Sequence, residues 1–474
     1  MMKRTISLCC LCLLILTGCG GKSDTVDTGT TAVDTTAIET EPAIAVKDFG
    51  GETVTIYIRY DTEGYEWNVS DLDAVEETGE PINDAVYRRN AAVMERYNVN
   101  LDIIKSNSNS CASTVRSSVL AGDNAYDIVI LSAYDMVTLS GEDMLYDLLT
   151  LENIDTSASY WNPTLSDSLT LGGKLYFAMG DLSSIDNRAV RCLYFNKDLF
   201  DKYNLEYPYD SVIDGSWTYD KFFEQMAVGT VDLDGNSIYD DNDQWGLFVQ
   251  PTIGTNLYYA SGRSFIGKDS SGKLMCEFNS EQSIEVMQRI SELVKANESN
   301  MVQSYEFQKY LTLFAENKSL FYAEVLYFTE YYRQYDFNFG ILPMPKYDEN
   351  QEGYQQFADG NCLNLCGIPI TNESAEDSAL LLEALSYESV ETLTPAFYDV
   401  CLIGKHVRDD ESADMLDIIF SSYVVDYANL FQLSIANSLN EALLGLRDVA
   451  STVQGSLVGN VLSGTRFRKR FHRI

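Results

Sequence analysis

An acidic segment between residues 232 and 243 has the spacing of a calcium-binding loop. Oxygen donors occupy loop positions 1, 3, 5, 9 and 12, and a backbone carbonyl falls at position 7. The predicted ligands are Asp232, Asp234, Asn236, Ile238 through its carbonyl, Asp240 and Asp243. Glycine stands at position 4 instead of 6, and aspartate replaces the glutamate of position 12, so a solvated acidic turn is the alternative. We expect a structural Ca²⁺, because the loop joins a predicted helix to a predicted strand and offers no nucleophile.

The residue types that common hydrolases require are scarce in this chain. Only two histidines occur, His406 and His472, and no Gly-x-Ser-x-Gly sequence accompanies a candidate serine. Phosphate-binding glycine loops are missing as well. Two carboxylates could cleave a glycosidic bond, but 71 acidic residues make such pairs easy to find by chance. We therefore assign no catalytic residue and expect a protein that is not an enzyme.

The N-terminus has the pattern of a bacterial lipoprotein export signal. Lys3 and Arg4 precede an apolar run over residues 6–16, which is too short to span a bilayer as a stable helix. The sequence Leu-Thr-Gly-Cys that follows looks like a lipobox, in which cleavage follows residue 18 and the Cys19 thiol carries lipid. An ordinary signal peptide is the alternative. Residues 19–49 are rich in Thr and Asp and predict a disordered tether, so we expect a lipid-anchored protein on the outer face of the cell membrane.

The net charge and the number of cysteines limit which partners, disulfides and metal sites the chain can have. The formal net charge of −38 repels phosphate backbones, so nucleic acid is excluded as a partner. Six cysteines lie beyond the signal region, too few for a disulfide framework in so long a chain, and we expect buried free thiols. No Cys/His cluster indicates a transition metal.

The first folded segment alternates strand and helix patterns. Residues 53–60, 99–104 and 126–131 are rich in β-branched and aromatic residues, whereas 82–97 and 111–120 have the apolar spacing of helices. This alternation predicts a parallel sheet with helices on its faces. Ligands bind beyond the carboxyl ends of such strands, so the loops that follow the first and third strands are prospective site segments.

A second α/β region begins near residue 150. Strands are expected at 192–195, 245–249, 319–323, 337–343 and 361–368, and helices at 219–226, 280–296, 376–388 and 413–428. The chain beyond the tether is far longer than the roughly 250–300 residues at which single cores stop growing. Two lobes are therefore expected.

Several short motifs resemble one family in their order. They are Gly-Lys-Leu-Tyr at 173–176, Leu-Tyr-Phe-Asn-Lys-Asp-Leu-Phe at 193–200, Ser-Trp-Thr-Tyr-Asp at 216–220, Phe-Ala-Glu-Asn-Lys-Ser-Leu-Phe at 314–321, Phe-Gly-Ile-Leu-Pro-Met-Pro-Lys at 339–346 and Gly-Ile-Pro at 367–369. In this order, behind a lipobox, they are similar to the extracellular solute-binding proteins of bacterial carbohydrate ABC importers. One departure is the basic tail at 465–474, of uncertain status.

The resemblance implies a two-lobed periplasmic-binding-protein-like α/β fold of type II, in which a mixed sheet flanked by helices forms each lobe and the hinge is crossed more than once. Lobe 1 is expected to comprise 50–150 plus 313–366, and lobe 2 to comprise 151–312 plus 367–464. The ligand is expected between the lobes, and closure around it is a population shift. The implied partners are a sugar or oligosaccharide and ABC permease subunits, and we expect a monomer.

The resemblance also implies ligand-binding residues. Sugars pack apolar C–H faces on aromatic rings and pair their hydroxyls with carboxylates and amides, and the chain has 31 Tyr, 21 Phe and 4 Trp. The predicted ligand-binding residues are Tyr60, Asp61, Tyr134, Asp135, Trp161, Asn187, Arg188, Gln250, Glu324, Tyr327 and Asp359.

Two alternative functions stay open at the level of sequence. A glycan-binding surface adhesin would share the tether, the acidic loop and the aromatic residues, but would present a flat aromatic strip instead of an interlobe cleft. A binding protein for a cationic or peptide solute would suit the strong acidity, although net charge does not report on a cleft.

Overall fold

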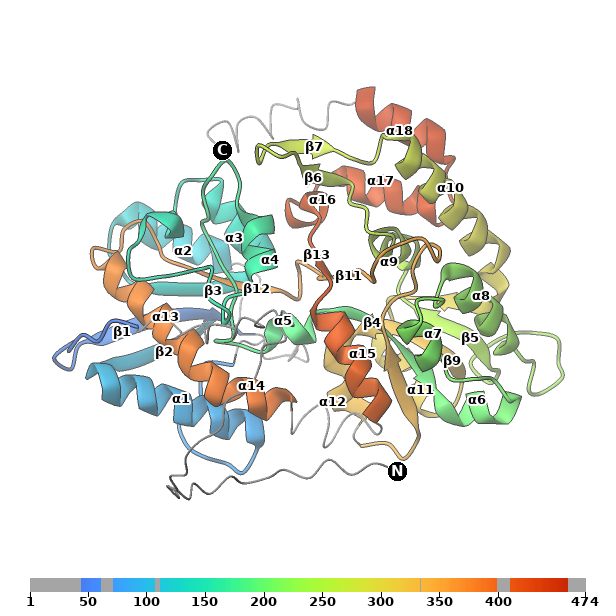
Figure 1. Cartoon of the computed structure of the whole chain (residues 1–474), viewed down its shortest axis with the longest axis horizontal. Coiled ribbons are helices and arrows are strands. Elements are labelled where there is room, and N and C mark those ends of the chain that lie inside the picture. Colours follow the sequence, from blue (N-terminus) through green and yellow to red (C-terminus); the bar gives the residue numbers. More distant parts are fainter. Residues whose placement is uncertain (1–43, 61–70, 107–110, 333, 399–409, 459–474) are drawn as a thin grey trace, which may run out of the picture. The chain divides into compact units, whose positions relative to one another are not determined.

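The computed structural model describes residues 44–60, 71–106, 111–332, 334–398 and 410–458. The predicted signal peptide, the predicted tether up to residue 43, Asp61 and the basic tail lie outside these ranges. The described chain is built around two separate β-sheets (Figure 1).

The first sheet has the strand order β12-β3-β1-β2. Its members are β1 (Thr53–Arg59), β2 (Asn100–Ser106), β3 (Ile128–Ser132) and β12 (Asn364–Gly367). Strand β1 runs parallel to β2 and β3, and β12 joins the edge antiparallel to β3. The predicted parallel sheet over the first segment is thus confirmed. Strand β3 is buried along its whole length, as its run of Ile, Val and Leu requires.

The second sheet has the order β10-β4-β9-β5-β8. Its members are β4 (Arg191–Asn196), β5 (Trp245–Val249), β8 (Met301–Gln303), β9 (Ser319–Val325) and β10 (Phe339–Leu342). Strand β9 is antiparallel to β4 and parallel to β5, so this sheet is mixed, as predicted. Two further pairs are β6 (Ile266–Lys268) with β7 (Leu274–Cys276), and β11 (Gln356–Phe357) with β13 (Tyr423–Val424).

Helices pack beside both sheets. They are α1 (Pro81–Tyr97), α2 (Cys111–Ala121), α3 (Ala133–Ser140), α4 (Pro163–Leu169), α5 (Ile185–Arg188), α6 (Lys197–Tyr203), α7 (Tyr209–Ile213), α8 (Tyr219–Val228), α9 (Ile253–Ala260), α10 (Glu281–Ala296), α11 (Phe307–Ala315), α12 (Thr329–Tyr332), α13 (Ala375–Glu391), α14 (Leu393–Pro395), α15 (Asp410–Phe420), α16 (Tyr427–Leu430), α17 (Ser434–Leu443) and α18 (Val449–Val458). Local signals set their ends: Asn196 accepts the backbone N–H of Leu199 at the start of α6, and left-handed Asn98 ends α1.

The assignment of strands to lobes differs from the prediction in one respect. Strands β9 and β10 were expected in lobe 1 with the segment 313–366, but they pair inside the second sheet with β4 and β5. Conversely, α13 was expected in lobe 2 but packs against α1 beside the first sheet (Figure 1). The cause is physical: all seven residues of β9 are buried, and a fully buried strand carries no pattern that says which sheet it joins.

Residues 413–428 were predicted to be helical throughout, and this is wrong. Helix α15 ends at Phe420, and the next residues form β13, which pairs with β11. Helix α16 then starts behind Asp426, whose carboxylate accepts the backbone N–H groups of Ala428 and Asn429. The apolar spacing continues across these breaks because α15 and α16 each bury apolar residues and both residues of β13 are half-buried.

The described chain passes between the two sheets three times. It leaves the first sheet between β3 and β4, returns between β10 and β12, and leaves again between α13 and α15. The first two crossing segments meet at a bridge between Val190 and Ala358. Arg191 and Asp359, the next residue in each segment, therefore lie where the two sheets connect.

Candidate functional site

A cavity of about 240 Å³ lies at the carboxyl ends of β5, β8 and β9, against the crossing segment that leads to β12. It is lined by Arg191, Gln250, Tyr305, Phe307, Glu324, Val325, Phe328, Asp359, Asn361 and Cys362. Strand ends of an α/β sheet are where ligands of such folds bind, because backbone and side chains of several loops converge there. A larger surface hollow of about 580 Å³ is lined by α17, α18 and the turn between them, and it has no aromatic side chain.

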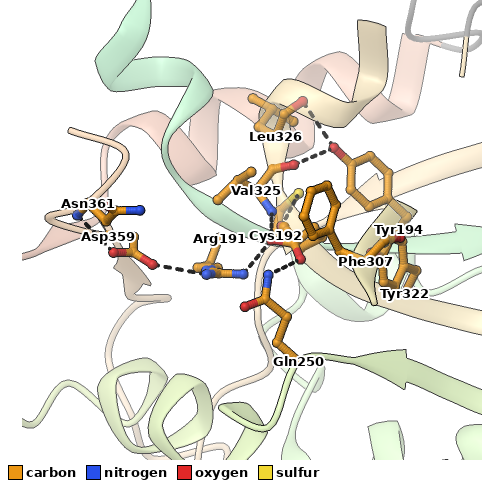
Figure 2. Close-up of polar contacts among 11 residues, drawn as sticks. Arg191, Cys192, Tyr194, Gln250, Phe307, Tyr322, Val325, Leu326, Asp359 and Asn361 are labelled. Carbon is orange, nitrogen blue, oxygen red and sulfur yellow. Dashed lines mark hydrogen bonds and ion pairs between the residues drawn. The ribbon is translucent and has the colours of Figure 1, made fainter. Parts of the chain in front are cut away.

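A buried ion triad forms the polar wall of this cavity. Arg191, the first residue of β4, donates from Nη1 to Oε1 of Glu324 on β9 and from Nη2 to Oδ2 of Asp359, 2.9 Å away (Figure 2). The Arg191 and Glu324 side chains are 7% and 2% exposed, whereas that of Asp359 is 18% exposed. Asp359 is therefore the carboxylate that an incoming ligand reaches first.

Further hydrogen bonds hold the two carboxylates. Gln250, directly after β5, donates to Oε2 of Glu324 at 2.6 Å, and the backbone N–H of Val325 donates to Oε1 at 3.0 Å. The backbone N–H of Asn361 donates to Oδ1 of Asp359 at 3.0 Å. The contacts thus run from Gln250 to the Glu324 carboxylate, from there to Arg191, and from Arg191 to Asp359 on the crossing segment (Figure 2). A buried charge with this many partners is stable, and removing one partner would be costly.

Electrostatics at the triad follow from this geometry. Burial by itself lowers the pKa of Arg191, but the charges of Glu324 and Asp359 outweigh burial and raise that pKa above its ordinary value. Burial raises the pKa of the neighbouring Cys362 thiol, so the thiol is neutral at physiological pH. The guanidinium is thus permanently charged, and the cavity contains no reactive thiolate.

Aromatic side chains form the apolar part of the cavity lining. Tyr305, just after β8, is 69% exposed, and Phe328 is 5% exposed. The Phe307 and Phe328 rings lie 5.8 Å apart between centroids. Exposed aromatic faces next to fixed hydrogen-bond acceptors can bind a molecule that has both C–H faces and hydroxyl groups.

The structure brings three of the predicted ligand residues together: Gln250, Glu324 and Asp359 all line the cavity. Tyr134 lies nearby, because its ring is the closest neighbour of the space beside Gly360, and its hydroxyl lies 3.5 Å from Oδ1 of Asn429. Burial, together with the charge of Asp359, raises the pKa of Tyr134.

The other predicted ligand residues that the structure describes do not line the cavity. Tyr60 lies under the Lys105 ammonium, and Asp135 accepts hydrogen bonds from Ser132 and from the N–H of Ala112 at the start of α2. Asn187 accepts from the Tyr423 hydroxyl at 2.7 Å.

Three more of the predicted residues have partners elsewhere. Arg188 pairs with Asp71 and Glu330. The Tyr327 ring packs edge-on against Phe328, which lines the cavity. The Trp161 side chain is fully buried, and its Nε1 donates to Glu383 on α13 at 2.7 Å.

Sequence reasoning missed Arg191, Tyr305, Phe307 and Asn361. A sequence feature could have identified Arg191, because it is the single charged residue inside the apolar run of residues 189–195. The rule that ligands bind at strand ends could have identified Tyr305, since it follows a strand of the second sheet as Gln250 does. Strand β8 is only three residues long, which hid it from pattern reading.

The acidic loop lies between α8 and β5, as predicted. Carboxylate oxygens of Asp232, Asp234 and Asp243 lie within 4.8 Å of one another. The side-chain oxygens of Asn236 and Asp240 accept the N–H groups of Ile238 and Asn242 and so close tight turns. Three converging carboxylates and further loop oxygens fit the all-oxygen coordination that Ca²⁺ prefers.

The described cysteines are free thiols, and Cys111, Cys192, Cys362 and Cys366 are buried as predicted, whereas Cys276 is half-buried. Among the described helices, none combines the length and apolar character needed to cross a bilayer.

Residues 90–388 match the family described as bacterial extracellular solute-binding protein. Because the match spans more than half of the chain, the chain belongs to this family, and it has the two-lobed α/β fold of solved solute-binding proteins. The predicted family and fold class are thereby confirmed. The members of this family are binding proteins and not enzymes.

Solved structures share the fold at low sequence identity. A sugar transporter from Rhizobium etli in an open conformation is 15% identical with a TM-score of 0.57, covering 87% of this chain and 100% of its own. An ABC substrate-binding protein from Listeria monocytogenes in complex with cycloalternan is 14% identical with a TM-score of 0.55 (87% and 98% covered). The Bdellovibrio bacteriovorus maltose/maltodextrin-binding domain bound to maltotriose is 14% identical with a TM-score of 0.52 (86% and 98% covered). Comparison with curated proteins found no match.

The Trp161–Glu383 contact generates a prediction. Trp161→Phe removes the indole N–H that donates to Glu383, a carboxylate only 5% exposed, and it should lower the free energy of unfolding by about 1–3 kcal/mol, measured by urea denaturation. Trp245→Phe is the control, because its Nε1 donates to the carbonyl of Asp240 at a partly exposed position and should cost less. Weakened ligand binding with unchanged stability in Trp161→Phe would instead place Trp161 in the site.

Proposed function

We propose that this protein captures a sugar or oligosaccharide in the cavity at Arg191, Glu324 and Asp359 and delivers it to an ABC permease. The observation that carries the proposal is the lining itself, where the exposed ring of Tyr305 and the half-buried ring of Phe307 lie beside an accessible carboxylate acceptor, Asp359. Sugars offer both an apolar ring face and donating hydroxyls, so such a lining suits them. The Listeria and Bdellovibrio proteins, which share the fold, hold cycloalternan and maltotriose.

The place of the cavity supports a transport role over an adhesin role. Its lining comes from the second sheet and from the crossing segment that connects to the first, so a ligand there touches the connection between the lobes. Contacts that change when the lobes move can shift a population toward closure, which a permease can recognise. A flat aromatic strip on one face would favour adhesion. The protein acts as a monomer in this proposal.

Isothermal titration of the purified mature protein against a panel of neutral mono- to tetrasaccharides tests the substrate class. We expect saturable single-site binding of at least one sugar, accompanied by a negative heat-capacity change as the aromatic wall is covered. Absence of heat with every sugar, together with binding of a peptide or a polyamine, would overturn the proposal.

A covalent lipid on Cys19 would hold the protein on the extracellular face of the cell membrane. The support is the Leu-Thr-Gly-Cys sequence at residues 16–19 behind a short apolar run. We expect the protein to take up a clickable fatty acid during growth and to sediment with membranes, because acyl chains bury many methylenes. Cys19→Ser should abolish labelling and release the protein. Labelling that persists in Cys19→Ser would contradict the anchor.

A structural Ca²⁺ is proposed for the acidic loop, with Asp232, Asp234 and Asp243 as the central ligands and Asn236, Asp240 and the Ile238 carbonyl completing the set. An ion that binds only the folded state raises its stability by mass action. The loop precedes the start of β5, whereas the cavity residue Gln250 follows the end of that strand, so the role of the ion would be to brace the entry to β5.

Calcium titration followed by thermal unfolding tests this site. Calcium should raise the melting temperature of the wild type over its value in chelator, and the double variant Asp232→Ala/Asp234→Ala should lose that rise. Asp269→Ala is the control, because Asp269 also accepts turn N–H groups, from Ser271 and Lys273, outside the acidic loop. Equal melting temperatures with calcium and with chelator in the wild type would rule the ion out.

A further inference from the structure

The cavity is balanced in charge although the chain is strongly acidic. Arg191, Glu324 and Asp359 are the charged residues among its described lining. A second guanidinium adjoins it, because Nη1 of Arg59, at the end of β1, donates to the carbonyl oxygen of Asn361 at 2.7 Å. The charges of two guanidinium groups thus offset those of two carboxylates. The cavity therefore has no net charge that would attract a charged ligand, and burying a ligand's charge without a counter-charge is costly.

The three triad residues are not equivalent in their access to a ligand. Glu324, 2% exposed, accepts three hydrogen bonds from described residues, so about one of its four lone-pair positions remains. Asp359, 18% exposed, accepts two, from Arg191 and from the N–H of Asn361, so about two positions remain. Glu324 is an anchor, and Asp359 is the acceptor open to the cavity.

We propose that Arg191 is the positioning residue that makes this cavity select neutral, hydroxyl-bearing ligands over sugar acids and amino sugars, by holding Asp359 as a fixed acceptor on the crossing segment. This inference rests on the proposed function and deepens it. Its basis is the chain of contacts from Glu324 through Arg191 to Asp359, which joins β9, β4 and the segment that leads to the first sheet.

Arginine suits this position for a geometric reason. Its planar guanidinium donates from Nη1 and Nη2 in fixed directions, so it can set the distance between carboxylates on two different segments. A lysine would supply the charge but not the fixed fork. The guanidinium groups of Arg191 and Arg59 together offset the charges of Glu324 and Asp359, which leaves an acceptor for hydroxyl groups without a strong attraction for cations.

Removal of the Asp359 charge should change the affinities for neutral sugars and for sugar acids in opposite directions. Asp359→Asn keeps the shape of the side chain but leaves Glu324 as the one carboxylate beside the guanidinium groups of Arg191 and Arg59, so one positive charge is then in surplus. Hydroxyl groups lose a charged acceptor and bind less tightly. A ligand carboxylate gains a counter-charge and binds more tightly, so the preference for neutral sugar over sugar acid falls.

The experiment measures affinities by isothermal titration for three ligands of matched ring stereochemistry. They are glucose, glucuronate and glucosamine, or galactose, galacturonate and galactosamine where the glycan panel identifies galactose. The wild type should bind the neutral sugar about tenfold or more tightly than either charged form. Arg191→Met should weaken binding of the neutral sugar by about tenfold to a hundredfold, and Arg191→Lys should recover only part of that loss.

Arg188→Met is the matched control for loss of a buried arginine. Arg188 lies three residues before Arg191 and pairs with Asp71 and Glu330, outside the cavity. We expect it to lower the melting temperature without changing the ratio of affinities for neutral and acidic sugar. Asp359→Asn should lower that ratio by about tenfold or more. This variant tests the inference even if an Arg191 variant does not fold.

The outcomes separate this inference from the proposed function. If the wild type binds no sugar of the panel, the proposed function fails. If it binds a neutral sugar but Asp359→Asn leaves the selectivity ratio unchanged, or Arg188→Met changes it equally, the role of Arg191 is wrong while sugar binding stands. Tighter binding of the amino sugar than of its neutral parent would also overturn the inference.

Discussion

A guanidinium buried between two carboxylates depends on exact neighbours more than any apolar contact does, because each charge loses its water and must regain that energy from its partners. In this protein Arg191 satisfies Glu324 and Asp359 at once. One carboxylate belongs to the second sheet and the other to the chain that returns to the first. The triad therefore fixes the cavity and the connection between the sheets by the same contacts, and displacement of any of the three residues would disturb both.

The fold makes this arrangement possible through strand order. Strands β5, β8 and β9 are parallel neighbours, so Gln250, Tyr305 and Glu324 arrive at one edge of the sheet. Strand β4 runs antiparallel to β9 and begins at that edge, which places Arg191 there at the end of a crossing segment. The bridge of Val190 with Ala358 then brings the second crossing segment, and Asp359 with it, to the same place. The aromatic residues and the acceptor meet because three parallel strands end, and the antiparallel strand β4 begins, at the same edge of the sheet.

Many elements of the fold and part of the site could be predicted from sequence, and there is a physical reason why the other features could not. Strand and helix patterns predicted most elements, and the resemblance to the solute-binding proteins of carbohydrate ABC importers implied Gln250, Glu324 and Asp359. Trp161 was chosen for its residue type, but the direction of its side chain depends on Glu383, 222 residues away. The sheet membership of β9 depended on pairing, which burial alone does not encode. Arg191 was overlooked because a single charged residue in an apolar strand does not indicate a binding site until its partners are known.

A crystal structure of the protein with the tightest-binding sugar of the panel tests the central claim most directly. The account predicts sugar density in the cavity at the ends of β5, β8 and β9, with a hydroxyl within hydrogen-bond distance of the Asp359 carboxylate and a ring face on Tyr305 or Phe307. Density at another place on the molecule, with the Arg191 triad untouched by ligand, would contradict it.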